Sequence, residues 1–377
     1  MIAGLRSPKT IARAAVGGAL VLSVLGSSMT SQAQDLTDIQ VSSEPLELQS
    51  RGSFIVGGES VEQTSDQLSF FTDAAEQPAG HVTINQMYVE YMVPVADNGL
   101  PVVMVHGATL SGKSYDTTPD GRMGRYEYFV RQGHPVYVPD QVSRARSGFD
   151  IATYNEVRAG EQPLSELPNF WRFGDELVWT QFRFGPTAGI AFPDEQFPVE
   201  AAGAFAGQAI PDLNAVLPTP NPNIAAVADL AGQLDGAVLL GHSQSGMLPV
   251  GAALADPTGI AGLIVIEPGT CRSADFTDEQ ITALAGIPIL TVFGDHLDAT
   301  TGTPVTWQNA YDDCMAFVDR LNTAGGNAEM LHPPDLGIHG NSHMIMMDKN
   351  NLQIADLILE WIDAQVAAGA TATPVSS

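Results

Sequence analysis

Basic residues are scarce in this chain. Lysine and arginine together number 16 against 43 aspartate and glutamate residues, which gives a formal net charge of −27 at pH 7. Such an excess of negative charge repels phosphate backbones and anionic membranes, so nucleic-acid binding is disfavoured. A neutral or cationic substrate is admitted more easily than a strongly anionic one, although the acidity also fits a role in solubility alone.

Long hydrophobic runs are also missing. The apolar run at 14–25 falls short of the roughly 20 residues that a membrane-spanning helix needs. Basic residues precede this run and small residues follow it: Arg6, Lys9 and Arg13, then Ser31-Gln32-Ala33. That order is typical of a secretory signal peptide with its cleavage site. The sequence therefore predicts a signal peptide at 1–33, export to the periplasm or the cell exterior, and no stable membrane insertion.

Cysteine is almost absent, with only Cys271 and Cys314 present. In an oxidising compartment a lone pair favours one disulfide, which would stabilise the fold by about 4 kcal/mol in the chain-entropy model. The alternative is a catalytic thiol, but neither cysteine has the local setting that such a thiol needs. The histidines are scattered without the paired spacing of zinc ligands, so no metal or cofactor is expected.

The 377 residues, 44% of them hydrophobic, suffice for one large core, so we expect a single domain at 34–377 that carries an insertion. Short apolar runs alternate with helical patterns, which indicates an α/β fold with a mostly parallel, twisted sheet and helices on both faces. Strands are expected at 87–95, 102–106, 136–139, 237–240, 262–266, 289–293 and 328–331, with an antiparallel hairpin around 54–58. Helices are expected at 125–132, 224–234, 244–254, 307–324 and 351–366, followed by a mobile tail at 367–377.

The alternation lapses over about 149–223, a stretch rich in proline, glycine and aromatic residues. So long an irregular passage inside a compact domain is usually a functional insertion, which predicts a cap over the active site. Its aromatic side chains would line an apolar pocket, or would simply form a second layer of core packing. These are Trp171, Phe173, Trp179, Phe182, Phe184 and Phe192.

The most specific motif is an apolar strand that runs through Gly241 and His242 into Ser243 and then into a helical pattern. This is the nucleophile elbow of the α/β-hydrolase fold, in which a sharp turn presents the serine hydroxyl at a helix N-terminus. The turn needs very small neighbours, and Ser245 replaces the usual second glycine with a residue that a tight turn can accept. His242 is interpreted as a packing residue.

A second buried strand ends in His106-Gly107-Ala108, where this fold places a loop that binds the developing oxyanion. The backbone N–H groups of Ala108 and Gln244 are therefore the expected oxyanion donors. Losing one such donor typically costs about 3 to 4 kcal/mol of transition-state stabilisation. His106 precedes the nucleophile, which is the wrong chain order for the catalytic base.

A serine nucleophile needs a histidine base and an acid, in the order serine, acid, histidine. The loop before the last helix offers His339 and His343, and His343 is preferred because it lies nearer that helix, while His332 fits a strand end. Three carboxylates end strands in the right interval: Glu267, Asp295 and Asp298. Any of them could face the histidine, but Glu267 closes an apolar strand and would be costly to bury without a partner.

With these motifs in order, the chain resembles a family of secreted bacterial α/β-hydrolase esterases over roughly 54–364. The residues that carry the resemblance are His106-Gly107, Thr-Pro-Asp-Gly-Arg-Met-Gly at 118–124, Glu-Pro-Gly at 267–269 and Gly-Asn-Ser-His-Met at 340–344. The resemblance implies a triad of Ser243, Glu267 and His343. A member of that family carries two consecutive cysteines, joined as a vicinal disulfide, where this sequence has Ala108-Thr109, so a more flexible oxyanion loop is expected here. The resemblance further supports pairing of Cys271 with Cys314 and implies a homodimer.

Together these observations predict a carboxylic-ester hydrolase that forms an acyl-enzyme at Ser243, with His343 as base and Glu267 as acid. The expected partner is a small-molecule or polymeric ester. A lactonase or polyester hydrolase would use the same residues and differ only in the cap. A non-catalytic binding protein that retains the fold is a third hypothesis, which hydrolysis of an activated ester would exclude.

Overall fold

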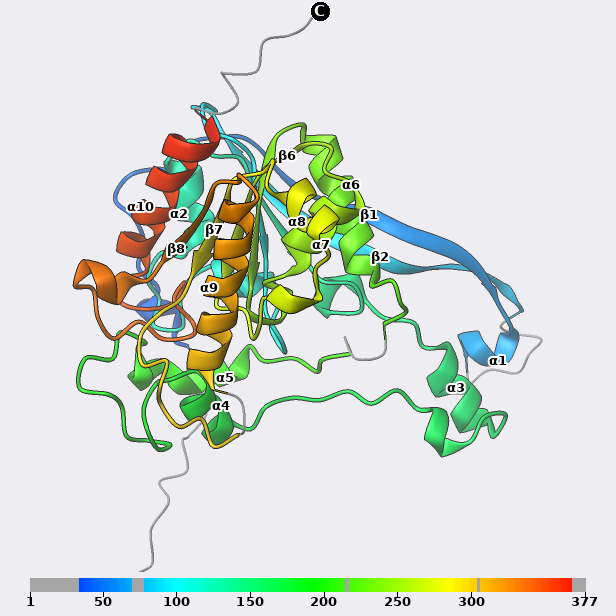
Figure 1. Cartoon of the computed structure of the whole chain (residues 1–377). Helices are drawn as coiled ribbons and strands as arrows, with labels where there is room; N and C mark the ends of the chain where they lie inside the picture. Colours follow the sequence, from blue (N-terminus) through cyan, green and yellow to red (C-terminus); the bar gives the residue numbers. More distant parts are fainter. Residues whose placement is uncertain (1–33, 70–77, 214–216, 304–305, 368–377) are drawn as a thin grey trace, which may run out of the picture.

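The computed structural model describes residues 34–69, 78–213, 217–303 and 306–367 (Figure 1). The expected signal peptide at 1–33 and nearly all of the expected tail lie outside the described residues. Eight strands form one sheet in the order β1-β2-β4-β3-β5-β6-β7-β8. They are β1 Leu48–Gln63, β2 Gly80–Pro94, β3 Val102–Val105, β4 Val136–Asp140, β5 Ala237–His242, β6 Ile260–Ile266, β7 Ile289–Val292 and β8 Ala328–Leu331. Strands β3 to β8 run parallel, while β1 and β2 are antiparallel to their neighbours.

Helices cover both faces of the sheet, which confirms the expected α/β-hydrolase fold class. They are α1 Ser65–Leu68, α2 Arg125–Arg131, α3 Ala152–Ala159, α4 Asp175–Gln181, α5 Ala202–Gly207, α6 Pro222–Leu234, α7 Leu248–Ala255, α8 Asp278–Leu284, α9 Trp307–Thr323 and α10 Asn351–Trp361. Strand β5 shows how the two layers form, because Leu239 joins the core under α6 to α9 and Leu240 joins the core under α2 and α10. Among the described residues, no helix is both long and apolar enough to cross a membrane.

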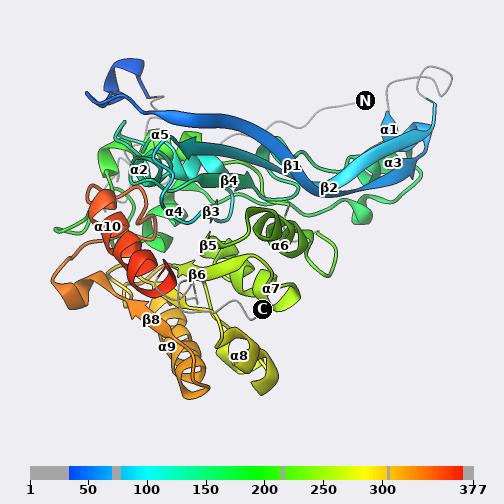
Figure 2. The same ribbon diagram turned by 90° about the horizontal axis from the view of Figure 1, so that it is seen from above.

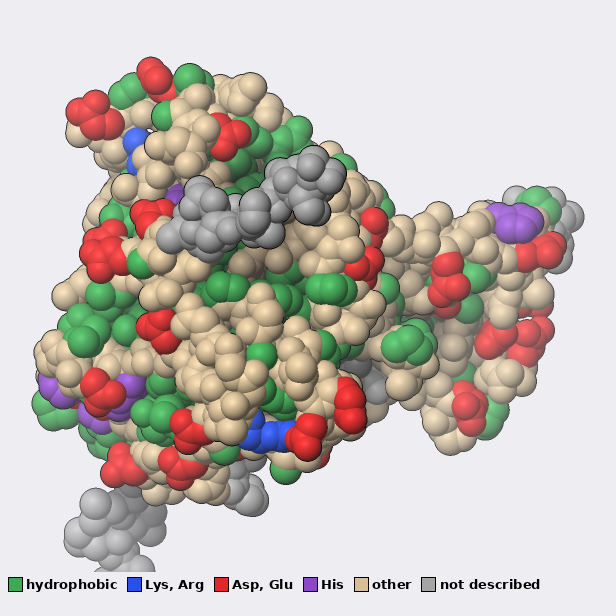
Figure 3. Space-filling view, turned by 45° about the horizontal axis from the view of Figure 1, so that its top comes forward, with side chains coloured by type: hydrophobic (Ala, Val, Ile, Leu, Met, Phe, Trp, Pro, Cys, Tyr) green, Lys and Arg blue, Asp and Glu red, His purple; other side chains and the backbone are tan. Residues whose placement is uncertain are grey.

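Strands β1 and β2 extend together well beyond the body of the fold and form an arm (Figures 1 and 2). Figure 3 shows this arm as a separate lobe that carries acidic side chains. The expected antiparallel strands at the sheet edge are present as β1 and β2, but the chain does not turn at 54–58. Strand β1 continues through Gly57 and Gly58, which have φ of 63° and 88° and interrupt the regular backbone without reversing it. The chain turns back only after Gln63.

The inserted segment at 149–223 divides between two places. Its first helix, α3, packs against α1 at the tip of the arm. Helices α4 and α5 lie beneath the sheet in Figure 1, where they adjoin the ends of the parallel strands. Only this second part adjoins the residues described below.

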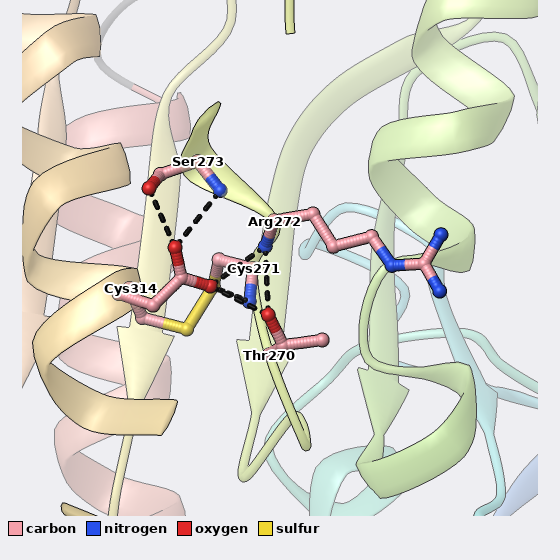
Figure 4. Close-up of a disulfide and its surroundings, with 6 residues drawn as sticks. Thr270, Cys271, Arg272, Ser273 and Cys314 are labelled. Atoms are coloured by element: carbon pink, nitrogen blue, oxygen red, sulfur yellow. Dashed lines mark hydrogen bonds between the residues drawn. A yellow bond between two sulfur atoms is a disulfide. The ribbon is translucent and has the colours of Figure 1, made fainter. Parts of the chain in front are cut away.

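Cys271 and Cys314 form the expected disulfide, which ties the loop after β6 to helix α9 (Figure 4). Beside it the carboxylate of Asp313 accepts hydrogen bonds from the backbone N–H groups of Cys271, Arg272 and Ser273 at 2.9, 2.8 and 3.0 Å. Burial raises the pKa of Asp313, but the hydroxyls of Ser273 and Thr270, together with the N–H groups of Ser273 and Arg272, outweigh burial and hold that pKa below its usual value. The turn that follows Glu267 is therefore fixed by one covalent bond and one carboxylate.

Candidate active site

Ser243 directly follows β5 and is the first residue of the short 3₁₀ helix Ser243–Ser245. Its φ of +57° is unusual for a residue with a side chain, and neighbouring contacts hold it there. A Cβ on Gly241 would lie 2.2 Å from the carbonyl oxygen of Ser245, so only glycine fits. The Ser245 hydroxyl donates to the carbonyl of Val105 on β3 at 2.9 Å, which shows how the turn accepts serine in place of glycine.

His343 lies between Ser243 and a carboxylate. Its Nε2 is 2.9 Å from the Oγ of Ser243, although the two residues are 100 positions apart in the chain. Its Nδ1 is 3.0 Å from Oε2 of Glu267. Because a carboxylate only accepts, Nδ1 carries the proton and Nε2 is left to accept the serine proton. The three groups form one continuous hydrogen-bonded chain.

Glu267 follows the last residue of β6 and is fully buried. Its Oε1 accepts hydrogen bonds from Arg183 and from the backbone N–H of Gly294, both at 2.5 Å. Burial alone raises the pKa of this carboxyl, but the Arg183 guanidinium and His343 outweigh burial and lower the pKa to about 2. Glu267 is therefore ionised at every pH at which the fold is expected to function.

The His343 ring is enclosed by aromatic side chains. Phe182 and Trp307 place ring centroids 4.7 and 4.4 Å from that of His343, and His242 lies at 4.8 Å. This burial lowers the pKa of His343 below its usual value, and the Glu267 carboxylate offsets part of the effect. His343 is thus neutral, and able to accept a proton, at neutral pH.

The loop that carries His343 is held by Asp348, which sequence reasoning did not single out. Its carboxylate accepts from the Ser342 hydroxyl at 2.6 Å and from Nδ2 of Asn341 at 2.9 Å. Burial raises the pKa of Asp348 to about 6 even though these bonds favour the ionised form. Arg122, from the motif at 118–124, donates to the carbonyls of Met347 and Asp348 at 2.8 Å. That motif therefore contributes to fixing the histidine loop.

The expected oxyanion loop runs directly against the serine. A Cβ added to Gly107 would meet the Cβ of Ser243 at 2.9 Å, so the close approach depends on glycine. Ala108 follows on this loop, and Gln244 follows the serine at the start of its helical turn, where backbone N–H groups have no partner within the helix. Both expected donors are therefore next in the chain to residues at the site: Ala108 follows Gly107, and Gln244 follows the serine.

The other histidines and carboxylates lie elsewhere. Asp295 accepts from the Gly340 N–H at 3.0 Å and lies 3.2 Å from His339, so it faces His339 and not His343. Asp298 is exposed, and His332 pairs with Asp335 at 3.2 Å. His106 is buried, and burial lowers its pKa to about 4. Its Nε2 accepts from the Gln141 N–H at 3.1 Å, so it braces the loop as a neutral ring.

One group of described residues has the arrangement of a metal site: Asp194, Asp295 and His296 bring one ligand atom each within 4.8 Å of one another. Asp194 is exposed and already pairs with His296 at 3.0 Å. The oxygen Oδ2 of Asp295 is occupied by Gly340 and His339. Among the described residues, the side chains of this group bond to one another, to His339 and to the Gly340 N–H, and not to Ser243 or His343.

An apolar pocket adjoins the expected oxyanion loop and shares Phe182 with the surroundings of the His343 ring. Its wall includes Thr109 and Leu110 from that loop, together with four of the six aromatic residues singled out in the insertion: Phe173, Trp179, Phe182 and Phe184. Phe205 of α5 closes it by packing against Phe182 at 6.1 Å between ring centroids. The space inside measures about 30 Å³, against roughly 150 Å³ for an engineered cavity that holds benzene. In this conformation the pocket takes only a small apolar group.

Comparison with known proteins finds relatives of this chain among esterases and lipases. A solved structure described as a novel bacterial esterase is 45% identical, with a TM-score of 0.80, and the match covers 87% of this chain and 99% of that one. A fungal protein (Fungal sp., strain ATCC 74256) named "Probable secreted lipase phiG" is 26% identical over 324 residues, or 74% of this chain and 86% of its own. No family model matches the chain. At 45% identity over almost the whole of the bacterial esterase, the chain belongs to the same α/β-hydrolase family as that enzyme.

Proposed function

We propose that the protein is a carboxylic-ester hydrolase in which Ser243 attacks, His343 transfers the proton and Glu267 orients the imidazole. The observation that carries this proposal is the unbroken chain of hydrogen bonds from Ser243 through His343 to Glu267. The names of the relatives, an esterase and a secreted lipase, support the same reaction class.

In the first half of the reaction the Oγ of Ser243 forms a bond to the ester carbonyl carbon and gives its proton to Nε2 of His343. The carbonyl oxygen becomes an oxyanion that accepts hydrogen bonds from the N–H groups of Ala108 and Gln244. The intermediate then collapses, and the bond to the alkoxy oxygen breaks. The leaving alcohol takes the proton from Nε2, and the acyl group remains on Ser243.

In the second half a water molecule attacks the acyl carbon and gives a proton to Nε2 of His343. Collapse of the new intermediate returns that proton to Oγ of Ser243 and releases the carboxylic acid. During both halves His343 is transiently cationic. Glu267, held ionised by Arg183, stabilises that cation without itself taking the proton.

The apolar pocket fits the acyl portion of the substrate. Two residues of its wall connect it to the catalytic groups. Thr109 belongs to the oxyanion loop, and Phe182 packs against the His343 ring. A space of about 30 Å³ favours short acyl groups over long fatty chains. The net charge of −27 disfavours strongly anionic esters.

Export of the protein is part of the same proposal. The order of basic, apolar and small residues at 1–33 supports a signal peptide, and the fungal relative is named as secreted. A disulfide between Cys271 and Cys314 is stable in an oxidising compartment, which fits export.

The test is to treat the purified protein with a fluorophosphonate, record the intact mass and map the labelled peptide. We expect one adduct on Ser243 that is absent from Ser243→Ala. Ser245→Ala is the matched control, because Ser245 lies in the same turn with its side chain buried. We expect this variant to be labelled at Ser243 as the wild type is, and the Ser245 hydroxyl of the wild type to remain unlabelled. Labelling at another residue, or failure to hydrolyse an activated short-chain ester, would contradict the proposal.

A further inference from the structure

The two proposed oxyanion donors come from segments far apart in the chain, and a buried ion pair bridges those segments. Arg144 lies after β4, and Asp212 lies in the inserted segment. The guanidinium Nη2 of Arg144 is 2.5 Å from Oδ1 of Asp212, with 1% and 0% of the two side chains exposed. Such a pair adds little to stability, because removing two charges from water offsets most of their attraction.

Arg144 holds the carbonyl groups on either side of the oxyanion residue. Its Nη1 donates to the carbonyl of Gly107 at 3.2 Å and to that of Leu110 at 3.4 Å. Its Nη2 also donates to Oε1 of Gln244 at 3.2 Å. One guanidinium therefore contacts both segments that supply the oxyanion donors.

Asp212 completes the arrangement from the opposite side. Its Oδ2 accepts from the backbone N–H of Thr109 and from Nε2 of Gln244, both at 3.1 Å. Thr109 has a φ of +55°, a conformation that needs such support in a residue with a side chain. The Thr109 carbonyl accepts a hydrogen bond from the Ile210 N–H at 2.8 Å. The inserted segment therefore bonds to both the N–H and the carbonyl of Thr109.

We propose that Arg144 and Asp212 are positioning residues that fix the distance between the Ala108 and Gln244 N–H groups. This inference rests on the proposed ester hydrolysis. Oxyanion stabilisation requires donors placed to within a fraction of an ångström. The segment around Asp212 is then a fixed part of the catalytic apparatus, and it contributes to kcat without touching the substrate.

The experiment compares Asp212→Asn and Arg144→Lys with wild type on an activated ester and on its thionoester. In the thionoester sulfur replaces the carbonyl oxygen, and sulfur accepts hydrogen bonds weakly, so hydrolysis of this substrate gains less from the oxyanion donors. We expect kcat for the ester to fall about ten- to a hundredfold with KM within about twofold. The ratio of ester to thionoester rates should fall with it.

The matched control is Arg146→Lys, which alters a neighbouring arginine that pairs with Asp140 and Glu90 and contacts neither Gly107 nor Gln244. It should leave kcat and the rate ratio unchanged. The inference is overturned if both variants keep the wild-type kcat, if ester and thionoester rates fall equally, or if Arg146→Lys matches their loss. If the wild type neither hydrolyses the ester nor reacts at Ser243, the proposed function fails and the inference falls with it. Melting temperatures recorded in parallel separate a rate effect from unfolding.

Discussion

The guanidinium of Arg183 lies 2.5 Å from the carboxylate of Glu267, and both side chains have no exposed surface. The carboxylate uses its other oxygen for His343 at 3.0 Å. Arg183 therefore allows an ionised carboxylate to exist behind the histidine although that carboxylate is fully buried.

Replacing Arg183 with methionine should destabilise the protein, because it leaves the Glu267 charge buried without its cationic partner. The free energy of unfolding is expected to fall by about 3 to 5 kcal/mol. The pKa of Glu267 should also rise, since the largest influence that lowers it is lost. Denaturant unfolding at pH 7 measures the first effect. Arg183→Lys, which keeps the charge, should lose less, and equal losses would show that packing outweighs charge here.

The pH dependence of kcat/KM should follow the protonation of His343. Because burial lowers the pKa of His343 below 6.5, the base stays neutral in weak acid and the acid limb should lie below pH 6.5. Glu267→Gln removes the charge that raises this pKa, so its acid limb should move further down while kcat falls by up to about 10⁴-fold. The measurement is a pH profile of kcat/KM for the wild type and for Glu267→Gln. An upward shift in Glu267→Gln would mean that the carboxylate does not act on His343.

Phe205→Ala should widen the substrate range. Its ring packs against Phe182 and Phe184 at 6.1 Å between centroids and closes the pocket of about 30 Å³. Removing it enlarges the space for an acyl chain, so the preferred p-nitrophenyl ester should shift from acetate toward butyrate or hexanoate. A matched control is Phe276→Ala, whose ring packs against Phe317 away from the pocket. If both variants keep the wild-type preference, this pocket does not hold the acyl group.

Loss of the disulfide should lower stability more than activity. A Cys271→Ser, Cys314→Ser variant releases the link between the loop after Glu267 and α9, and its free energy of unfolding should fall by about 2 to 5 kcal/mol. Because Asp313 still holds the same loop through Arg272 and Ser273, kcat at 25 °C should change by less than about tenfold. Adding Asp313→Asn to the double variant should then reduce both the free energy of unfolding and kcat. Unfolding curves and kcat measured on the three proteins test this order.

The sheet was predictable because its central strands are buried on both faces and therefore read as short apolar runs. The strand expected at 328–331 is observed at Ala328–Leu331, and β5 ends next to the serine as its motif requires. Helix α10 stops at Trp361, earlier than expected, and the chain continues as a π-helical turn at Ile362–Ala367. Helix α8 was missed because only two of its seven residues, Ile281 and Leu284, are apolar and buried, which gives too weak a periodic pattern. Helix α2 has the same length but buries Tyr126, Phe129 and Val130, so its pattern is readable.

The supporting residues could not be predicted in the same way. Arg183 and Glu267 are 84 positions apart, and Arg144 and Asp212 are 68 positions apart. Which charged residue of an irregular insertion meets which strand end depends on the path of the whole chain. The spacing of neighbouring residues does not predict that path, whereas the serine turn is specified by residues adjacent in the sequence.

Strand β1 is one edge of the sheet, and among the described strands it pairs with β2 alone. A long open edge can serve as a template for strands of other molecules, which is how many soluble proteins begin to aggregate. The exposed side chains of Arg51, Glu59 and Glu62 place charges along this edge, and Gly57 and Gly58 interrupt its regular course. The arm therefore discourages edge-to-edge stacking, and concentrated solutions of the protein should remain dispersed despite so exposed a strand.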